Sequence, residues 1–233
     1  MEPRQVAAGQ GWQWIVQGFE LFKKSPVIWL ALWIILFLIA LGLHFIPILG
    51  PLALYILWPV FVGGLMIGCQ AQRNGEELEI AHLFAGFRKN VNSLIALGGL
   101  YLVGQIVILG VMFLLGGGAM FTIMRSGQPD IAALASALSG AMLALLVGLA
   151  LYVPLAMALW FAPALAVFQN MQAVPALKSS FDACLKNIIP FLIYGIALTV
   201  LSIIACIPLF LGFLVLIPVI FTSIYASYRD IYA

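Results

Sequence analysis

Four long stretches of the chain contain no Asp, Glu, Lys or Arg. They cover residues 26–72, 91–124, 131–177 and 187–228. A helix of roughly 20 apolar residues crosses a bilayer core of about 30 Å, so each stretch can hold one span or two. Only 8% of the residues are charged and the mean hydropathy is +1.18. A soluble domain is about a quarter charged, so we expect an all-α integral membrane protein.

Helix-breaking residues divide the first and last stretches. The first contains HFIPILGP (residues 44–51) and the last contains CIPLFLG (residues 206–212), and both are rich in the Pro and Gly that end helices. They predict spans near 26–45, 51–70, 187–206 and 210–228, while the middle stretches supply one span each. We expect six transmembrane helices as three hairpins in a single membrane domain, residues 1–233.

The middle hairpin allows two interpretations, because each of its apolar runs exceeds one ordinary span. In the first, the glycines at 116–118 end the third span and leave residues 119–140 as an outer connection. In the second, Pro154 and Pro163 kink a long, tilted fourth span. The sequence leaves the conformation of residues 116–145 open.

The basic residues predict the orientation. With six spans, Arg125 falls alone on one side and nine cations fall on the other: Arg4, Lys23, Lys24, Arg73, Arg88, Lys89, Lys178, Lys186 and Arg229. Short cytoplasmic loops carry the excess of Lys and Arg, so we expect both termini in the cytoplasm. The charges in residues 1–25 do not fit a secretory signal peptide, so the first span is expected to stay uncleaved.

A loose threefold repeat precedes the odd-numbered spans. The matching sets are Ile15, Phe19, Phe22, Lys24 and Ser25; Ile80, Phe84, Phe87, Lys89 and Asn90; and Leu177, Phe181, Cys184, Lys186 and Asn187. Apolar residues at i, i+4 and i+7 lie on one face of a helix. They predict three units, 11–72, 76–169 and 173–229, each a cytoplasmic amphipathic helix followed by a hairpin. Basic loops before spans share this general composition, which would also explain the pattern.

The amphipathic helices carry six candidate lipid-headgroup residues: Lys23, Lys24, Arg88, Lys89, Lys178 and Lys186. A basic amphipathic helix lies in the membrane interface with its apolar face down. Each cation near an anionic leaflet contributes about 1 kcal/mol. The sequence therefore predicts membrane lipids, acidic ones included, as partners, although the same cations could serve topology alone.

Candidate helix-packing residues lie within the middle spans. Ala132, Ser136, Gly140, Ala144 and Gly148 recur every four residues, and such a stripe of small residues lets a second helix approach closely. That helix could be the third span, another membrane protein or a second copy of the chain. Gln105, a strongly polar side chain deep in the third span, is expected to hydrogen-bond a neighbouring helix.

No motif predicts a catalytic site, metal or cofactor. The spans contain no ionisable Asp, Glu, Lys or Arg, which argues against an ion-coupled transporter and an intramembrane protease. His44 and His82 are interpreted as interface residues. Cys69, Cys184 and Cys206 form no CxxC pair and are expected to be buried, reduced thiols. The net charge of +2 carries no signal for nucleic acid.

The segments GWQWIVQGFELFKKSPVIW at the N-terminus and LFAGFRKN between spans two and three resemble a family of uncharacterised bacterial inner-membrane proteins. More remotely, they are similar to the membrane domain of some glycerophosphodiester phosphodiesterases. The resemblance implies six spans in a bacterial cytoplasmic membrane and transfers no catalytic residue.

Two functions remain as expectations. The first is a non-enzymatic protein that organises or stabilises membrane components through lipid and helix contacts. The alternative is a passive channel, transporter or scramblase for an uncharged or lipid-like substrate, with prolines at 59, 154 and 218 kinking the even-numbered spans.

Overall fold

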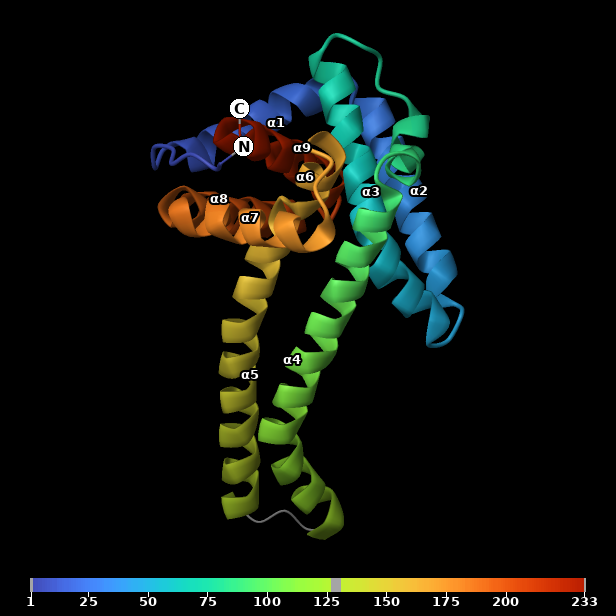
Figure 1. Ribbon diagram of the computed structural model, residues 1–233. Helices are drawn as coiled ribbons and strands as arrows, with labels where there is room; N and C mark the ends of the chain where they lie inside the picture. Colours follow the sequence, from blue (N-terminus) through green and yellow to red (C-terminus); the bar gives the residue numbers. More distant parts are fainter. Residues whose placement is uncertain (1, 127–130, 233) are drawn as a thin grey trace. The chain divides into compact units, whose positions relative to one another are not determined.

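The computed structural model describes residues 2–126 and 131–232, without the side chains of residues 118–126, 132 and 133. All regular elements in this part of the chain are helices (Figure 1): α1 Gln10–Lys24, α2 Pro26–His44, α3 Leu49–Arg73, the 3-10 helix η1 Ile80–Arg88, α4 Val91–Ser126, α5 Ile131–Trp160, α6 Ala162–Phe168, α7 Ala173–Lys186, α8 Ile188–Cys206 and α9 Phe213–Tyr232. Six segments are long and apolar enough to cross a membrane: Pro26–His44, Leu49–Arg73, Val91–Gly117, Leu134–Phe168, Ile188–Cys206 and Phe213–Tyr232. The prediction of an all-α protein with six spans is confirmed.

The turns that close the first and third hairpins share two features. Ile48 in the first and Phe210 in the third both have a φ of 66°, although the φ of Leu209 in the third turn is also positive, at 51°. A glycine follows two residues after Ile48 and after Phe210, and it packs so closely against the preceding helix that a Cβ would overlap its last turn. The pairs are Gly50 with the backbone of Leu43 and Gly212 with the backbone of Ala205. The two predicted helix breaks therefore form turns with the same glycine contact.

In the middle hairpin the helical backbone runs past the glycines at 116–118, while the segment apolar enough to span a membrane ends at Gly117. α4 continues through Gly116 and Gly117 and ends at Ser126. The interruption lies instead at Phe161, between α5 and α6, where Pro163 stands in the first turn of α6. A glycine in a helix costs only about 1 kcal/mol, whereas proline removes a backbone donor. The fourth span is thus long and broken near Pro163, and residues 127–130 lie outside the described part.

The chain forms two compact units, Leu100–Ala156 and the combination of Met1–Gly99 with Met157–Ala233. In the smaller unit, α4 and α5 lie side by side (Figure 1). Small residues allow this approach, because a Cβ on Gly148 would lie 2.5 Å from the sulfur of Met112. The two further close pairs are Gly116 with Ala144 and Gly104 with Leu155. The larger unit contains the other two hairpins and all three predicted amphipathic segments.

Candidate functional site: the basic end of the larger unit

Helix α1 packs against both helices of the third hairpin, α8 and α9 (Figure 1). Two glycines permit the contact: a Cβ on Gly11 would overlap the carbonyl oxygen of Pro190, and one on Gly18 would lie 2.7 Å from the nitrogen of Ser223. The hydroxyl of Thr222 donates to the carbonyl of Gly18 at 2.8 Å. The first amphipathic helix is therefore held by the last hairpin of the chain.

The two ends of the chain meet beside this contact. The indole of Trp14 donates to Asp230 at 2.9 Å, and Arg4 forms an ion pair with the same carboxylate at 3.3 Å. Asn187, which caps α8, accepts from the backbone nitrogen of Val6 at 2.9 Å and donates to the carbonyl of Arg4 at 3.0 Å. Residues 4–6 are thus fastened to both α8 and α9.

The second amphipathic segment, η1, packs against α3 in the first hairpin. A Cβ on Gly64 would lie 2.6 Å from the carbonyl oxygen of Leu83, and one on Gly86 would overlap the carbonyl of Val60. Leu83 is fully buried in this contact. The backbone approach explains why a short 3-10 helix can be held firmly on the longer helix.

His82 has a structural role in this segment. Its Nδ1 accepts a hydrogen bond from the backbone nitrogen of Glu79 at 3.0 Å, and the Glu79 side chain accepts one in return from the backbone nitrogen of His82. The two residues thus form a capping box at the start of η1. Glu79 therefore starts η1.

The third amphipathic helix, α7, packs against α6 and the end of α5. Ser180 donates to the carbonyl of Met157 at 2.7 Å and accepts from the backbone nitrogen of Phe161 at 2.9 Å. It thereby satisfies two backbone groups that the break between α5 and α6 leaves without a helical partner. Cys184 lies in the same contact, and burial raises the pKa of its thiol to about 12.

Two asparagines at the starts of odd-numbered spans bond to segments that precede amphipathic helices. The amide of Asn90, before α4, donates to the carbonyls of Ala166 and Met171 at 3.0 Å each. Both acceptors belong to the segment that leads into α7. Asn187, before α8, bonds in the same way to the segment that leads into α1. Each asparagine therefore fixes the segment that precedes an amphipathic helix.

All six predicted headgroup cations are exposed. Lys23 forms an ion pair with Glu20 at 2.7 Å and lies over the ring of Phe19, and Lys186 donates to the carbonyl of Pro3 at 3.4 Å. The described residues form two ion pairs, and neither involves any of the six predicted cations other than Lys23. Exposed aromatic rings accompany the cations of α1 and η1, namely Trp12, Phe19, Phe84 and Phe87, whereas α7 carries no exposed ring. Cations beside exposed aromatic rings are typical of a membrane interface.

The apolar faces of the amphipathic segments meet protein more than the sequence predicts. Ile15 and Phe22 of α1 are buried in the larger unit, whereas Phe19 between them is 42% exposed. The reason is the close approach at Gly11 and Gly18, which turns most of the apolar face toward α8 and α9. Only part of that face remains for lipid.

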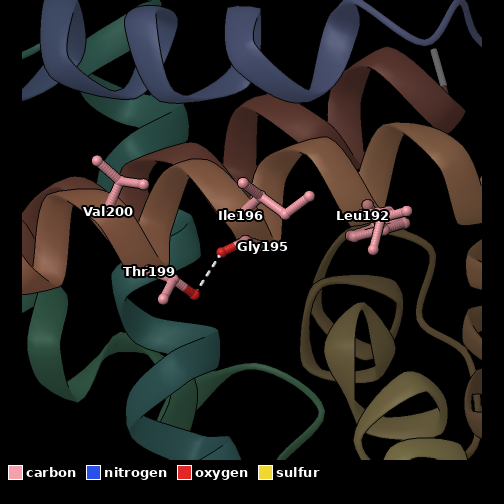
Figure 2. Close-up of a pocket in the computed structure, with 6 residues that line it drawn as sticks. Leu192, Gly195, Ile196, Thr199 and Val200 are labelled. Carbon is pink, nitrogen blue, oxygen red and sulfur yellow. Dashed lines mark hydrogen bonds between the residues drawn. The ribbon is translucent and has the colours of Figure 1, made fainter.

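An open apolar groove of about 400 Å³ runs along α8 (Figure 2). Its described lining is Phe191, Leu192, Gly195, Ile196, Thr199 and Val200. The hydroxyl of Thr199 donates to the carbonyl of Gly195 at 2.8 Å (Figure 2), so this side chain offers the groove no free donor. The groove is suited to a hydrocarbon chain.

The predicted helix-packing residues are distributed between packed and exposed positions. Ala144 and Gly148 are buried against α4, Gly140 is half-buried and Ser136 is exposed. Gln105 is half-buried on α4, and its bond to a neighbouring helix stays a prediction. The side chains of Ala132 and Arg125 lie outside the described residues.

One cysteine differs from the expectation. Cys69 and Cys184 are buried free thiols, but Cys206 is exposed because it stands in the last turn of α8, where the chain leaves the helix. No group of three potential metal ligands occurs among the described residues.

Sequence reasoning missed the glycines that hold α1. Gly11 and Gly18 are seven residues apart and therefore lie on one helix face, which is a recognisable signal for close helix packing. The partners of Asn187 and Asp230 had no such signal, because each lies more than 180 residues away in the sequence.

The six apolar spans and the basic ends of the hairpins define a multi-pass α-helical membrane protein. The chain is 30% identical over 201 residues to a probable inner membrane protein of Burkholderia thailandensis, covering 84% of this chain and 74% of that relative. It belongs to the family of that protein and is a multi-pass inner membrane protein. No family model matches the chain, and no solved structure matches it.

Proposed function

We propose that this protein is a non-enzymatic membrane organiser, which holds acidic lipids at the basic ends of its hairpins and stabilises membrane components through lipid and helix contacts. The observation that carries the proposal is the combination of exposed cations and exposed aromatic rings on helices that are themselves locked to the spans. Because α1, η1 and α7 pack closely on the spans, the helix positions that carry the cations are fixed before a lipid arrives. Preorganised groups lose less entropy on binding.

The proposal includes an orientation with both termini in the cytoplasm. Nine cations against one support it, since short cytoplasmic loops are enriched in Lys and Arg. Anionic lipids give the cytoplasmic leaflet its negative surface potential, so the basic ends would face the leaflet that attracts them. The remote likeness to the membrane domain of glycerophosphodiester phosphodiesterases stays a prediction and adds no activity to this proposal.

The test replaces Lys24, Lys89 and Lys186 together with Gln. At about 1 kcal/mol for each cation, the loss of three should lower retention of phosphatidylglycerol by up to about a hundredfold. A variant with Arg at the same three positions keeps the charge and serves as the matched control. Lipid that co-purifies with each variant is measured by mass spectrometry, at low and high salt. Retention by the Gln variant equal to that of the Arg variant would rule out the lipid part of the proposal.

A second candidate, a passive channel, transporter or scramblase for a lipid-like substrate, is favoured by one observation. The groove on α8 is open, apolar and aligned with a span, so it could guide a hydrocarbon tail. This candidate requires lipid to pass the protein, whereas the membrane organiser requires lipid to stay with it.

A further inference from the structure

The groove on α8 lies on a face of that helix that the rest of the larger unit leaves uncovered. Leu192, Ile196 and Val200, spaced four residues apart, are 61%, 58% and 51% exposed. In contrast, Pro190 and Tyr194 are buried where α8 meets α1 and α9. The exposed face and the α1 contact meet only at Phe191, whose ring lies 5.1 Å from that of Trp14.

A notch in the middle of the groove comes from Gly195. A Cβ at this position would meet no atom within 4 Å, so the missing side chain leaves open space and not a packing contact. Ile196 and Leu192 border this notch (Figure 2). Glycine lowers helix propensity by about 1 kcal/mol relative to alanine, and nothing in the fold of the larger unit requires it here.

The length and lining of the groove suit a single hydrocarbon chain. Phe191 and Val200 are nine residues apart, which is about 13 Å along the helix. The groove between them has a volume of about 400 Å³ and is lined by apolar side chains apart from Thr199, whose hydroxyl is bonded to the Gly195 carbonyl.

The charge at one end of α8 favours a phospholipid with an acidic headgroup. Lys186 is exposed two residues before α8 begins, and no carboxylate of the described residues forms an ion pair with it. From Ile188, where α8 begins, Gly195 lies about 10 Å further along the helix and Val200 about 18 Å further. One leaflet contributes about 15 Å of hydrocarbon, so a headgroup at Lys186 places the acyl chain over the notch.

We propose that the groove on α8 binds one acyl chain of a phospholipid whose acidic headgroup is held at Lys186. This inference rests on the proposed function, since it assigns one of the acidic lipids to a defined site. The headgroup contact is electrostatic, and the chain contact is the burial of hydrocarbon against Leu192, Ile196 and the Gly195 notch.

The test fills the notch in the full-length protein with Gly195→Trp and, as a smaller change, Gly195→Leu. Both side chains enter open space, so the protein is expected to fold. The matched control is Gly99→Leu, because a Cβ on Gly99 also meets no atom within 4 Å but lies on α4. Each purified variant is titrated with phosphatidylglycerol or phosphatidylcholine, and the bound lipids are counted by native mass spectrometry.

We expect Gly195→Trp to lose one bound phosphatidylglycerol while Gly99→Leu keeps it. Lys186→Gln should keep the chain site but lower its preference for phosphatidylglycerol over phosphatidylcholine by about fivefold. Unchanged binding in both Gly195 variants would overturn the groove site, and so would a change in oligomeric mass, which would indicate a protein occupant. If the triple Lys variant loses phosphatidylglycerol while both Gly195 variants bind it normally, the proposed function stands and only this site is ruled out.

Discussion

At the scale of single residues, glycines decide where the first amphipathic helix lies. Gly18 brings the α1 backbone against Ser223, and Thr222 then reaches the Gly18 carbonyl at 2.8 Å. We expect Gly18→Leu to lower the free energy of unfolding by about 1–3 kcal/mol, because the added side chain overpacks the contact. Thermal unfolding in detergent measures the effect, with Gly9→Leu as control, since Gly9 has no neighbour within 4 Å of a Cβ. Equal melting temperatures for the two variants would contradict the close packing of α1.

The three cysteines give a second prediction at the same scale. Burial raises the pKa of Cys184 to about 12, so its thiol is protonated, and unreactive, at neutral pH. Cys69 is buried as well, whereas Cys206 is exposed. A membrane-permeable maleimide at pH 7.5 should therefore modify one site in the folded protein, and Cys206→Ser should abolish the reaction. Labelling that persists in Cys206→Ser would show that α7 or α3 opens far more than the structure implies.

At the scale of elements, the sequence predicted the helices well and their contacts poorly. The charge-free stretches and the Pro-containing turns were enough to locate six spans, because a bilayer allows few alternatives to a helix. The amphipathic pattern located α1, η1 and α7 but not the partners of their apolar faces. Those partners lie in other hairpins, and a periodicity within one helix carries no information about them.

The three amphipathic segments pack on the spans in the same way. Each packs against the second span of the hairpin that precedes it, and α1, which has no preceding hairpin, packs against the last one, through α9. The contact lies one to seven residues after a proline in all three cases: Pro59 before Val60 and Gly64, Pro154 before Met157 and Phe161, and Pro218 before Thr222 and Ser223. We propose on this basis that residues 11–72, 76–169 and 173–229 are repeats of one unit. The loose residue classes of the repeat are understandable, since the contact depends mainly on backbone approach.

At the scale of the whole molecule, the protein combines exposed cations on packed helices with apolar spans whose charged side chains, Arg73, Arg229 and Asp230, lie at the span ends. The larger unit is closed by the contact of α1 with α9 and by the ion pair of Arg4 with Asp230. A protein built this way offers acidic headgroups fixed positions at the end of each hairpin. Its central claim is that lipid is bound and kept there, and is not merely passed across the membrane.

Native mass spectrometry of the protein, extracted with its surrounding membrane in a polymer nanodisc, tests that claim most directly. The account predicts a fixed number of acidic lipids for each protein, enriched over the bulk membrane and lost as salt rises. A protein that carries only lipid of bulk composition at every salt concentration would contradict the account and favour the channel, transporter or scramblase.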